Sequence, residues 1–170
     1  MTTRVVEASQ ESIPPRVLLA ALRVLLGIIL IVTWFDNQAK GLYGPQAFGG
    51  FVNWLATAGE GHPLGFYRGF LLNVVQPNAS VFAGFQLVTE LAMGIALLAG
   101  AFTSLAGAAA SLFFLNLFLA YLNPGTEEWI WTQVLLLAVA LVVTLGRAGR
   151  SLGVDALLVR SRGEPRLPVY

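Results

Sequence analysis

Two charged residues, Arg23 and Glu90, lie inside long apolar runs of this sequence. Ionisable side chains are costly in hydrocarbon, so each of them marks a candidate site. If the runs are helices, the two residues differ in depth by only about 5 Å, at about 1.5 Å rise per residue. Long side chains can bridge that difference, and an unpaired charge is far less stable than a paired one. We therefore predict an ion pair between Arg23 and Glu90.

Two roles are open for this pair. A buried carboxylate beside a guanidinium can bind or protonate a polar group such as a quinone carbonyl, which makes Arg23 and Glu90 the candidate catalytic residues. The alternative role is a structural clasp that sets the register of two helices. A Glu90→Gln variant, assayed for both folding and activity, separates the two roles.

A second group of residues lies where the first apolar run ends. Trp34, Asp36 and Lys40 are there, and Trp129 begins the last run from the same side of the predicted topology. Charges and indole rings on one rim can bind a planar ligand, so these four are candidate cofactor-binding residues. The favoured alternative is an ordinary belt of interfacial aromatic residues.

The elements that must position these residues are four apolar runs, each about as long as a membrane span. They cover 17–35, 80–99, 103–122 and 129–145, and none alternates with the period of two typical of a strand. We expect an all-α integral membrane protein whose single domain, 1–170, is a four-transmembrane-helix antiparallel bundle. The third run has small residues in its first half and bulky ones in its second. The helices should therefore pack tightly near the cytoplasm and splay outward, which leaves any cavity open on the outer side.

The segment 36–79, between the first two spans, is too apolar for a free loop. Helical spacing of its apolar residues predicts short interfacial helices over 46–58 and 64–75. The segment either covers the bundle as a lid or packs on the membrane surface without forming a site. His62, in the turn between the two helices, is expected to be solvated.

Composition and charge support the membrane class. The chain is 56% hydrophobic and 11% charged, whereas a soluble domain is about 25% charged. This composition excludes a disulfide-stapled secreted domain and a nucleic-acid binder, and it makes the lipid bilayer the first expected partner. Seven arginines lie in the tails 1–16 and 146–170. The positive-inside rule then places both termini in the cytoplasm.

The residue inventory narrows the chemistry further. The sequence has no cysteine, which excludes a thiol relay and iron–sulfur ligation. One histidine cannot supply a bis-histidine haem site or a histidine-rich metal site. We expect no intrinsic cofactor and no metal site. A quinone is the candidate ligand of the bundle, and a partner would then carry the redox centre.

Three stretches occur in an order that resembles a known family. They are LRVLLGIILIVTWFDNQAK, ELAMGIALLAGAFTSLAG and GRAGRSLGVDALL. Their matching residues are Arg23, Gly27 and Lys40; Glu90, Gly94 and Gly100; and Gly146, Arg147, Gly149, Arg150, Gly153 and Asp155. Taken together they resemble the DoxX/DoxD-like family of small four-helix bacterial and archaeal membrane proteins, and the resemblance covers nearly the whole chain.

The resemblance implies a protein of the bacterial or archaeal cytoplasmic membrane that is linked to oxidoreduction. The DoxD branch is named for the small membrane subunit of thiosulfate:quinone oxidoreductase. The chain is then expected to be a subunit of a quinone-linked oxidoreductase, with other membrane or peripheral subunits or as a homo-oligomer. The alternative is a non-catalytic structural or accessory subunit of a larger membrane complex. A transporter is a third reading, less favoured because no repeat or broken helix pair is discernible.

Overall fold

The computed structural model describes residues 14–126, 130–150 and 152–163, and its regular elements are all helices. The long elements are α1 (Pro15–Ala39), α4 (Ala79–Ala99), α5 (Thr103–Ala120) and α6 (Trp131–Leu145). Shorter ones are α2 (Pro45–Thr57), α3 (Gly65–Phe70) and α7 (Val154–Arg162), with the short turns η1 (Leu71–Val75), η2 (Gln76–Asn78), η3 (Pro124–Thr126) and η4 (Ala148–Arg150). The expected all-α class is confirmed.

Three helices are long and apolar enough to cross a membrane. They are α1, the 35-residue run Gly65–Ala99, and α5. The fourth, α6, is apolar but has 15 residues, whereas a perpendicular span needs about 20. The membrane-type helices are therefore confirmed, and a four-span arrangement depends on α6.

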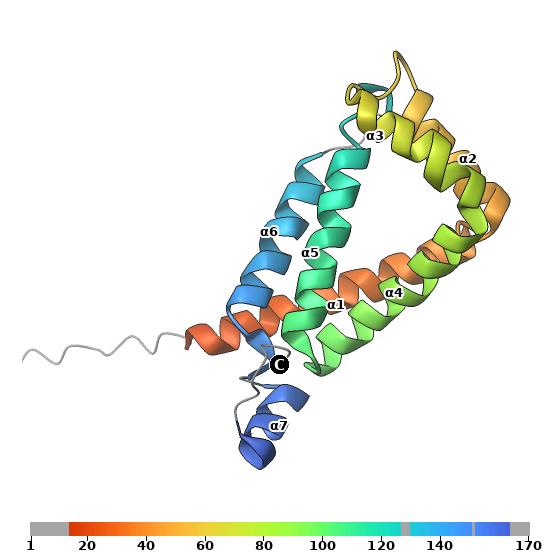
Figure 1. Cartoon of the computed structure of the whole chain (residues 1–170). Coiled ribbons are helices and arrows are strands. Elements are labelled where there is room, and N and C mark those ends of the chain that lie inside the picture. The colour runs from red at the N-terminus through yellow and green to blue at the C-terminus, as the bar shows by residue number, and fades with distance from the viewer. Residues whose placement is uncertain (1–13, 127–129, 151, 164–170) are drawn as a thin grey trace, which may run out of the picture.

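The long helices form two antiparallel pairs, α1 with α4 and α5 with α6, and α1 also contacts α6. The pairs meet near the turn 100–102, and α4 and α5 diverge from it (Figure 1). Gly100 ends α4 with φ +68°, a left-handed conformation that suits glycine. The splay predicted from the residue sizes of the third run is therefore present.

One predicted interfacial helix does not exist as a separate element. The segment 64–75 continues through α3, η1 and η2 directly into α4, so the chain forms one bent helix instead of two. Pro77 explains the bend, because proline lacks an amide hydrogen and its ring clashes with a carbonyl one turn earlier. The π-helical turn Leu71–Val75 and the 3₁₀ turn Gln76–Asn78 accommodate it. The other predicted helix, 46–58, is present as α2.

The core has two separate parts. The first joins the four long helices near the turn 100–102 and includes Leu26, Leu30, Leu97 and Val143. The second joins α2 to the bent helix and includes Phe48, Val52, Leu71 and Ala83. The helices α2 and α3 thus bridge the ends of the two diverging pairs (Figure 1).

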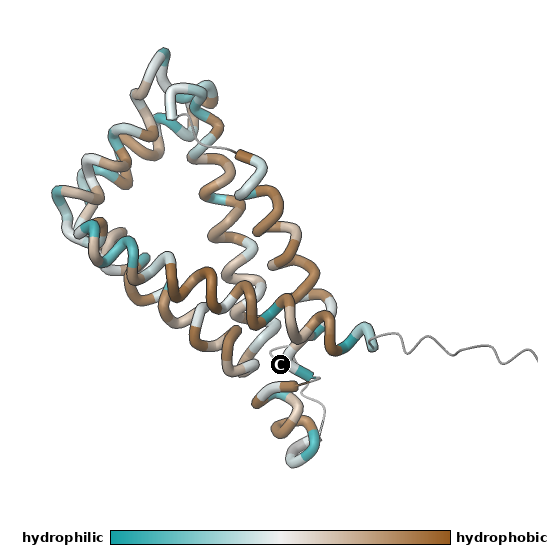
Figure 2. Tube along the Cα trace, turned by 180° about the vertical axis from the view of Figure 1, so that it is seen from behind, coloured by the Kyte–Doolittle hydropathy of each residue, from teal (hydrophilic) through white to brown (hydrophobic). Residues whose placement is uncertain are grey.

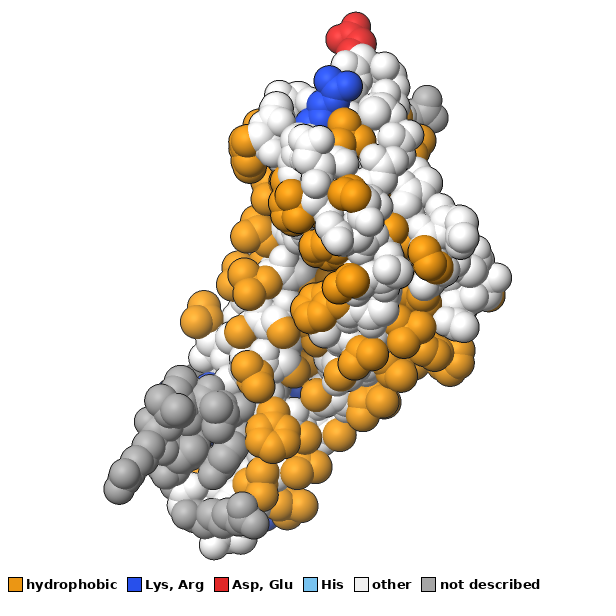
Figure 3. Space-filling model, turned by 45° about the vertical axis from the view of Figure 1, so that its right-hand side comes forward, with side chains coloured by type: hydrophobic (Ala, Val, Ile, Leu, Met, Phe, Trp, Pro, Cys, Tyr) orange, Lys and Arg blue, Asp and Glu red, His pale blue; other side chains and the backbone are white. Residues whose placement is uncertain are grey.

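Hydrophobic side chains also cover much of the outside. Val81, Phe85 and Val88 on α4 are 67%, 67% and 62% exposed, and their spacing puts them on one face of the helix. Hydrophilic residues lie mostly near helix ends and turns (Figure 2). The space-filling view shows acidic and basic side chains at the end beyond α2 and α3, with apolar ones along the body (Figure 3). This surface suits contact with lipid.

Candidate functional site

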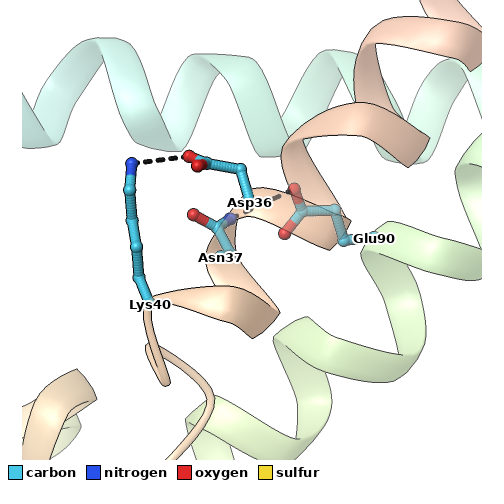
Figure 4. Close-up of polar contacts among 4 residues, drawn as sticks. All are labelled: Asp36, Asn37, Lys40 and Glu90. Atoms are coloured by element: carbon cyan, nitrogen blue, oxygen red, sulfur yellow. Dashed lines mark hydrogen bonds and ion pairs between the residues drawn. The ribbon is translucent and has the colours of Figure 1, made fainter.

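The carboxylate of Glu90 is fully buried and is held by three hydrogen-bond donors. Tyr43 donates its hydroxyl at 2.9 Å, Gln86 its side-chain nitrogen at 3.3 Å, and Asn37 its side-chain nitrogen at 3.4 Å. The close-up shows Asn37 reaching Glu90 from the end of α1 (Figure 4). Asn37 bonds to one carboxyl oxygen, and Tyr43 and Gln86 bond to the other, so both buried oxygens are satisfied.

Tyr43 connects this network to the loop between α1 and α2. Burial raises the pKa of its hydroxyl well above the usual range, and the neighbouring carboxylate of Glu90 acts in the same direction. The phenol therefore keeps its proton at neutral pH. It remains a donor to Glu90 across the physiological range.

Arg23 and Glu90, both in the described part of the chain, do not pair, so the predicted ion pair is wrong. Arg23 is 2% exposed and donates to the carbonyl oxygen of Leu152 at 2.6 Å, while Asp155 attracts it electrostatically. A Cβ on Gly100 or Gly153 would overlap its guanidinium. Arg23 is thus a clasp for the segment that follows α6, not for Glu90.

The axial register of α1 against α4 explains why Arg23 and Glu90 do not form the predicted ion pair. Arg23 lies beside Gly100, ten residues after Glu90, which corresponds to about 15 Å along a helix. Gly27 sets this register, because a Cβ there would lie 2.8 Å from the backbone nitrogen of Leu98 and 3.0 Å from the carbonyl oxygen of Gly94. The start of α1 therefore extends past the end of α4. Residues at equal distances from the ends of the two apolar runs consequently lie at different levels in the structure.

Asp155, which lies in the stretch GRAGRSLGVDALL, is fully buried. Its two carboxylate oxygens accept the amide hydrogens of Phe102 and Thr103 at 2.7 and 2.8 Å. This caps the beginning of α5 with a charge that the helix dipole favours. The amide nitrogen of Asp155 also donates to the carbonyl oxygen of Gly100 at 2.8 Å. A side chain 52 residues away thus fixes the α4–α5 turn.

Three of the predicted rim residues, Trp34, Asp36 and Lys40, lie at the C-terminal end of α1. Asp36 and Lys40 form an exposed ion pair at 2.5 Å (Figure 4), of a kind that adds little stability. Trp34 donates its indole N–H to the carbonyl oxygen of Leu87 at 2.9 Å and thereby ties α1 to α4. Trp129 lies outside the described residues. None of the three described residues lines the cavity between α4 and α5.

That cavity has a volume of about 380 Å³. It lies where α4 and α5 diverge. The elements α2, α3 and η1 close it at the end away from the turn 100–102. Aromatic and aliphatic side chains form most of the lining, among them Phe51, Phe70, Phe82, Met93 and Phe113. Phe85 and Leu112 at its edge are 67% and 69% exposed, so the cavity opens sideways along the apolar surface.

A few polar side chains interrupt the apolar lining. They are Gln86, Thr89, Tyr67 and Asn116. Thr89 is satisfied within its own helix by the carbonyl oxygen of Phe85 at 2.7 Å. Gln86 bonds to Glu90, and Tyr67 donates to the side-chain oxygen of Asn116 at 2.9 Å. Apolar cavities with a few placed polar groups are typical of sites for small lipophilic ligands.

His62 is buried at 5% exposure, contrary to the expectation that it is solvated. Its Nε2 lies 2.8 Å from the carbonyl oxygen of Leu119, and its Nδ1 accepts the amide hydrogen of Leu64 at 3.2 Å. Nearby, the side-chain nitrogen of Asn123 donates to the carbonyl oxygens of Leu55 and Ala58 at 2.9 and 3.1 Å. These bonds fasten α2 and the loop after it to the end of α5.

Sequence reasoning did not identify the contacts of four residues: Asn37, Tyr43 and Tyr67 near the cavity, and Asp155 at the α4–α5 turn. Asn37 and Tyr43 had a readable signal, since they follow the first predicted span closely and the predicted topology puts them on the same side as the first half of the second span. Gln86 and Glu90 are four residues apart, which places them on one helix face. Tyr67 and Asp155 act across about 50 residues, and no local pattern indicates their partners.

Comparison with protein-family models, curated proteins and solved structures finds no match to this chain.

Proposed function

We propose that the chain is a four-span membrane protein that binds a quinone in the cavity between α4 and α5. It would act as the membrane subunit of a quinone-linked oxidoreductase of the DoxX/DoxD-like kind. A partner protein would carry the redox centre, because this sequence has no cysteine and one histidine. The observation that carries the proposal is the sideways-opening apolar cavity with amide side chains in its wall.

The size and lining of the cavity suit such a ligand. Sites for small molecules occupy about 300–1,000 Å³, and this cavity has about 380 Å³. Among the described residues, its lining carries no Lys, Arg, Asp or Glu. A neutral, flat, lipophilic molecule arriving from the bilayer therefore loses little solvation on entry.

The course of the chain supports the membrane topology. The described chain begins at α1 and ends at α7 on the same end of the molecule, beside the turn 100–102 (Figure 1). An even number of crossings produces this arrangement, and α6 is the fourth apolar helix. Arg147, Arg150 and Arg160 lie in the segment after α6, which by the positive-inside rule is the cytoplasmic side of the membrane.

Quinone content tests the proposal. The wild-type protein, purified in mild detergent, should retain quinone in a stoichiometric amount that extraction and chromatography can quantify. Ala109→Phe adds a ring within the cavity wall and should reduce the retained quinone severalfold or more, because the two rings compete for one volume.

Ala92→Phe is the matched control. Ala92 is exposed on α4 and does not line the cavity, so this variant should retain quinone like the wild type. Equal quinone loss in both variants, or no quinone in the wild type, would contradict the proposal. Proteins that co-purify with the wild type identify the redox partner.

An accessory role is the second candidate. Glu90 is satisfied by three neighbours of the same chain, and Arg23 binds the segment after α6. The two buried charges therefore serve to hold helices together, as a purely structural subunit requires. A large stable assembly without quinone would favour this role.

A further inference from the structure

We propose that Gln86 and Asn116 hold the two ring carbonyl oxygens of a quinone from opposite walls of the cavity. The inference rests on the proposed function and names the groups that would recognise the ligand. Three observations support it. The two amides lie at the same distance from the α4–α5 turn, and each is oriented by a hydrogen bond to a neighbouring side chain. The cavity lining that the structure describes carries no charged side chain.

The two amides lie at the same level of the α4–α5 hairpin. Gln86 lies 15 residues before Ala101, and Asn116 lies 15 residues after it. Both helices rise about 1.5 Å per residue, so the two side chains start at equal heights above the turn. Both line the cavity, and the divergence of α4 and α5 keeps the helices apart at this level (Figure 1).

A second polar side chain orients each amide. The hydroxyl of Tyr67 donates to the side-chain oxygen of Asn116 at 2.9 Å, which leaves the amide N–H groups of Asn116 for the cavity. The side-chain nitrogen of Gln86 donates one hydrogen to Glu90 at 3.3 Å, which leaves its other hydrogen. Neither amide nitrogen has a further hydrogen-bond partner among the residues that the structure describes.

Two donors on facing walls select a particular ligand shape. They fit a flat apolar body with one acceptor at each end, and a quinone ring has its two carbonyl oxygens in that arrangement. The rings of Phe82 and Phe113 in the same wall match its apolar faces. A phospholipid also has carbonyl groups, but its esters lie side by side next to a charged headgroup, for which the described lining has no counter-charge.

Infrared spectroscopy of the bound quinone tests this geometry. The probe is a short-chain ubiquinone, isotopically labelled at both ring carbonyls and added to the purified protein in detergent. Both labelled carbonyl bands should shift to lower frequency than in detergent alone. Asn116→Leu should return one band to its unbound position, and Gln86→Met should return the other. Each variant should weaken quinone binding about threefold to tenfold, as expected for one lost hydrogen bond.

Two further variants make the test specific. Gln133→Met makes the same exchange in α6, away from the cavity lining, and should leave both bands shifted. Tyr67→Phe removes only the hydroxyl that orients Asn116, so it should weaken the shift of the Asn116-dependent band and leave the Gln86-dependent band unchanged. Tyr67 is in this sense a positioning residue.

The outcomes separate this inference from the proposed function. Quinone that binds to the wild type with both carbonyl bands unshifted, or with bands that Asn116→Leu and Gln86→Met leave unchanged, overturns the assignment of the two amides alone. A shift confined to lipid ester bands overturns the assignment to quinone. A wild-type protein that binds no quinone overturns both proposals.

Discussion

Glu90 shows how a buried carboxyl group is held when the predicted counter-ion is absent. Its carboxylate is fully buried and accepts hydrogen bonds from Asn37, Tyr43 and Gln86, which come from three different parts of the chain. Both carboxyl oxygens have a hydrogen-bond donor, so neither is left unsatisfied in the interior. The network therefore joins the loop after α1 to the middle of α4 and supports the amide of Gln86 at the cavity.

Replacing Glu90 with Gln should destabilise the protein. The glutamine has nearly the same size, but its amide nitrogen cannot accept the donors that now bond to an oxygen. We expect a loss of about 1–3 kcal/mol in the free energy of unfolding, the typical result of leaving buried polar groups unsatisfied. Thermal unfolding in detergent measures it. Glu60→Gln, at an exposed turn position, is the control, and an unfolding temperature equal to the wild type in both variants would refute a structural role.

Glycine residues at the contact between α1 and α4 set how these two helices pack. Gly27 lies so close to Leu98 and Gly94 that a Cβ would be 2.8 Å from a backbone nitrogen. Small residues commonly let membrane helices approach in this way. The same contact places Arg23 beside Gly100 and Glu90 near the end of α1, which is why the two charges have different partners.

Two glycine-to-alanine variants should have opposite effects. Gly27→Ala forces the backbones of α1 and α4 apart and should destabilise the protein by about 1–3 kcal/mol, as overpacking does. Gly84→Ala, on α4 with nothing within 4 Å of its would-be Cβ, should stabilise by up to about 1 kcal/mol through helix propensity. Thermal unfolding under identical detergent conditions compares them. Similar destabilisation by both substitutions would show that the close approach at Gly27 is not what sets the register.

The whole molecule consists of two helix pairs joined at one end and bridged by α2 and α3 at the other (Figure 1). The wedge between α4 and α5 forms the cavity, and the bent helix around Pro77 closes it. The number of membrane crossings then depends on α6, whose 15 described residues are fewer than those of the other long helices.

Reporter fusions should determine the topology. A reporter that is active only in the periplasm should be inactive when fused after Tyr170 and active when inserted after Glu60, because four crossings return the chain to the cytoplasm. A reporter that is active only in the cytoplasm should give the opposite pattern at both sites. Periplasmic activity at both sites would mean that α6 does not cross the membrane.

The helical class, the approximate extents of the apolar helices and the divergence of α4 and α5 could be predicted from the sequence. These follow from local features: run length, the absence of alternation, and the change from small to bulky residues in the third run. The prediction of a separate helix over 64–75 was wrong, because an apolar stretch before Pro77 is compatible with either a separate helix or the first part of a bent one.

The pairing of the polar groups depends on how the helices pack and could not be predicted from the sequence. The binding of Arg23 to Leu152, the capping of α5 by Asp155 and the contact of Tyr67 with Asn116 all join residues at least 49 positions apart. Their partners depend on the axial register of packed helices, which close glycine contacts fix to within one turn. A shift of a single helical turn moves a side chain by about 5.4 Å and changes every partner. Composition and periodicity contain no information about that shift.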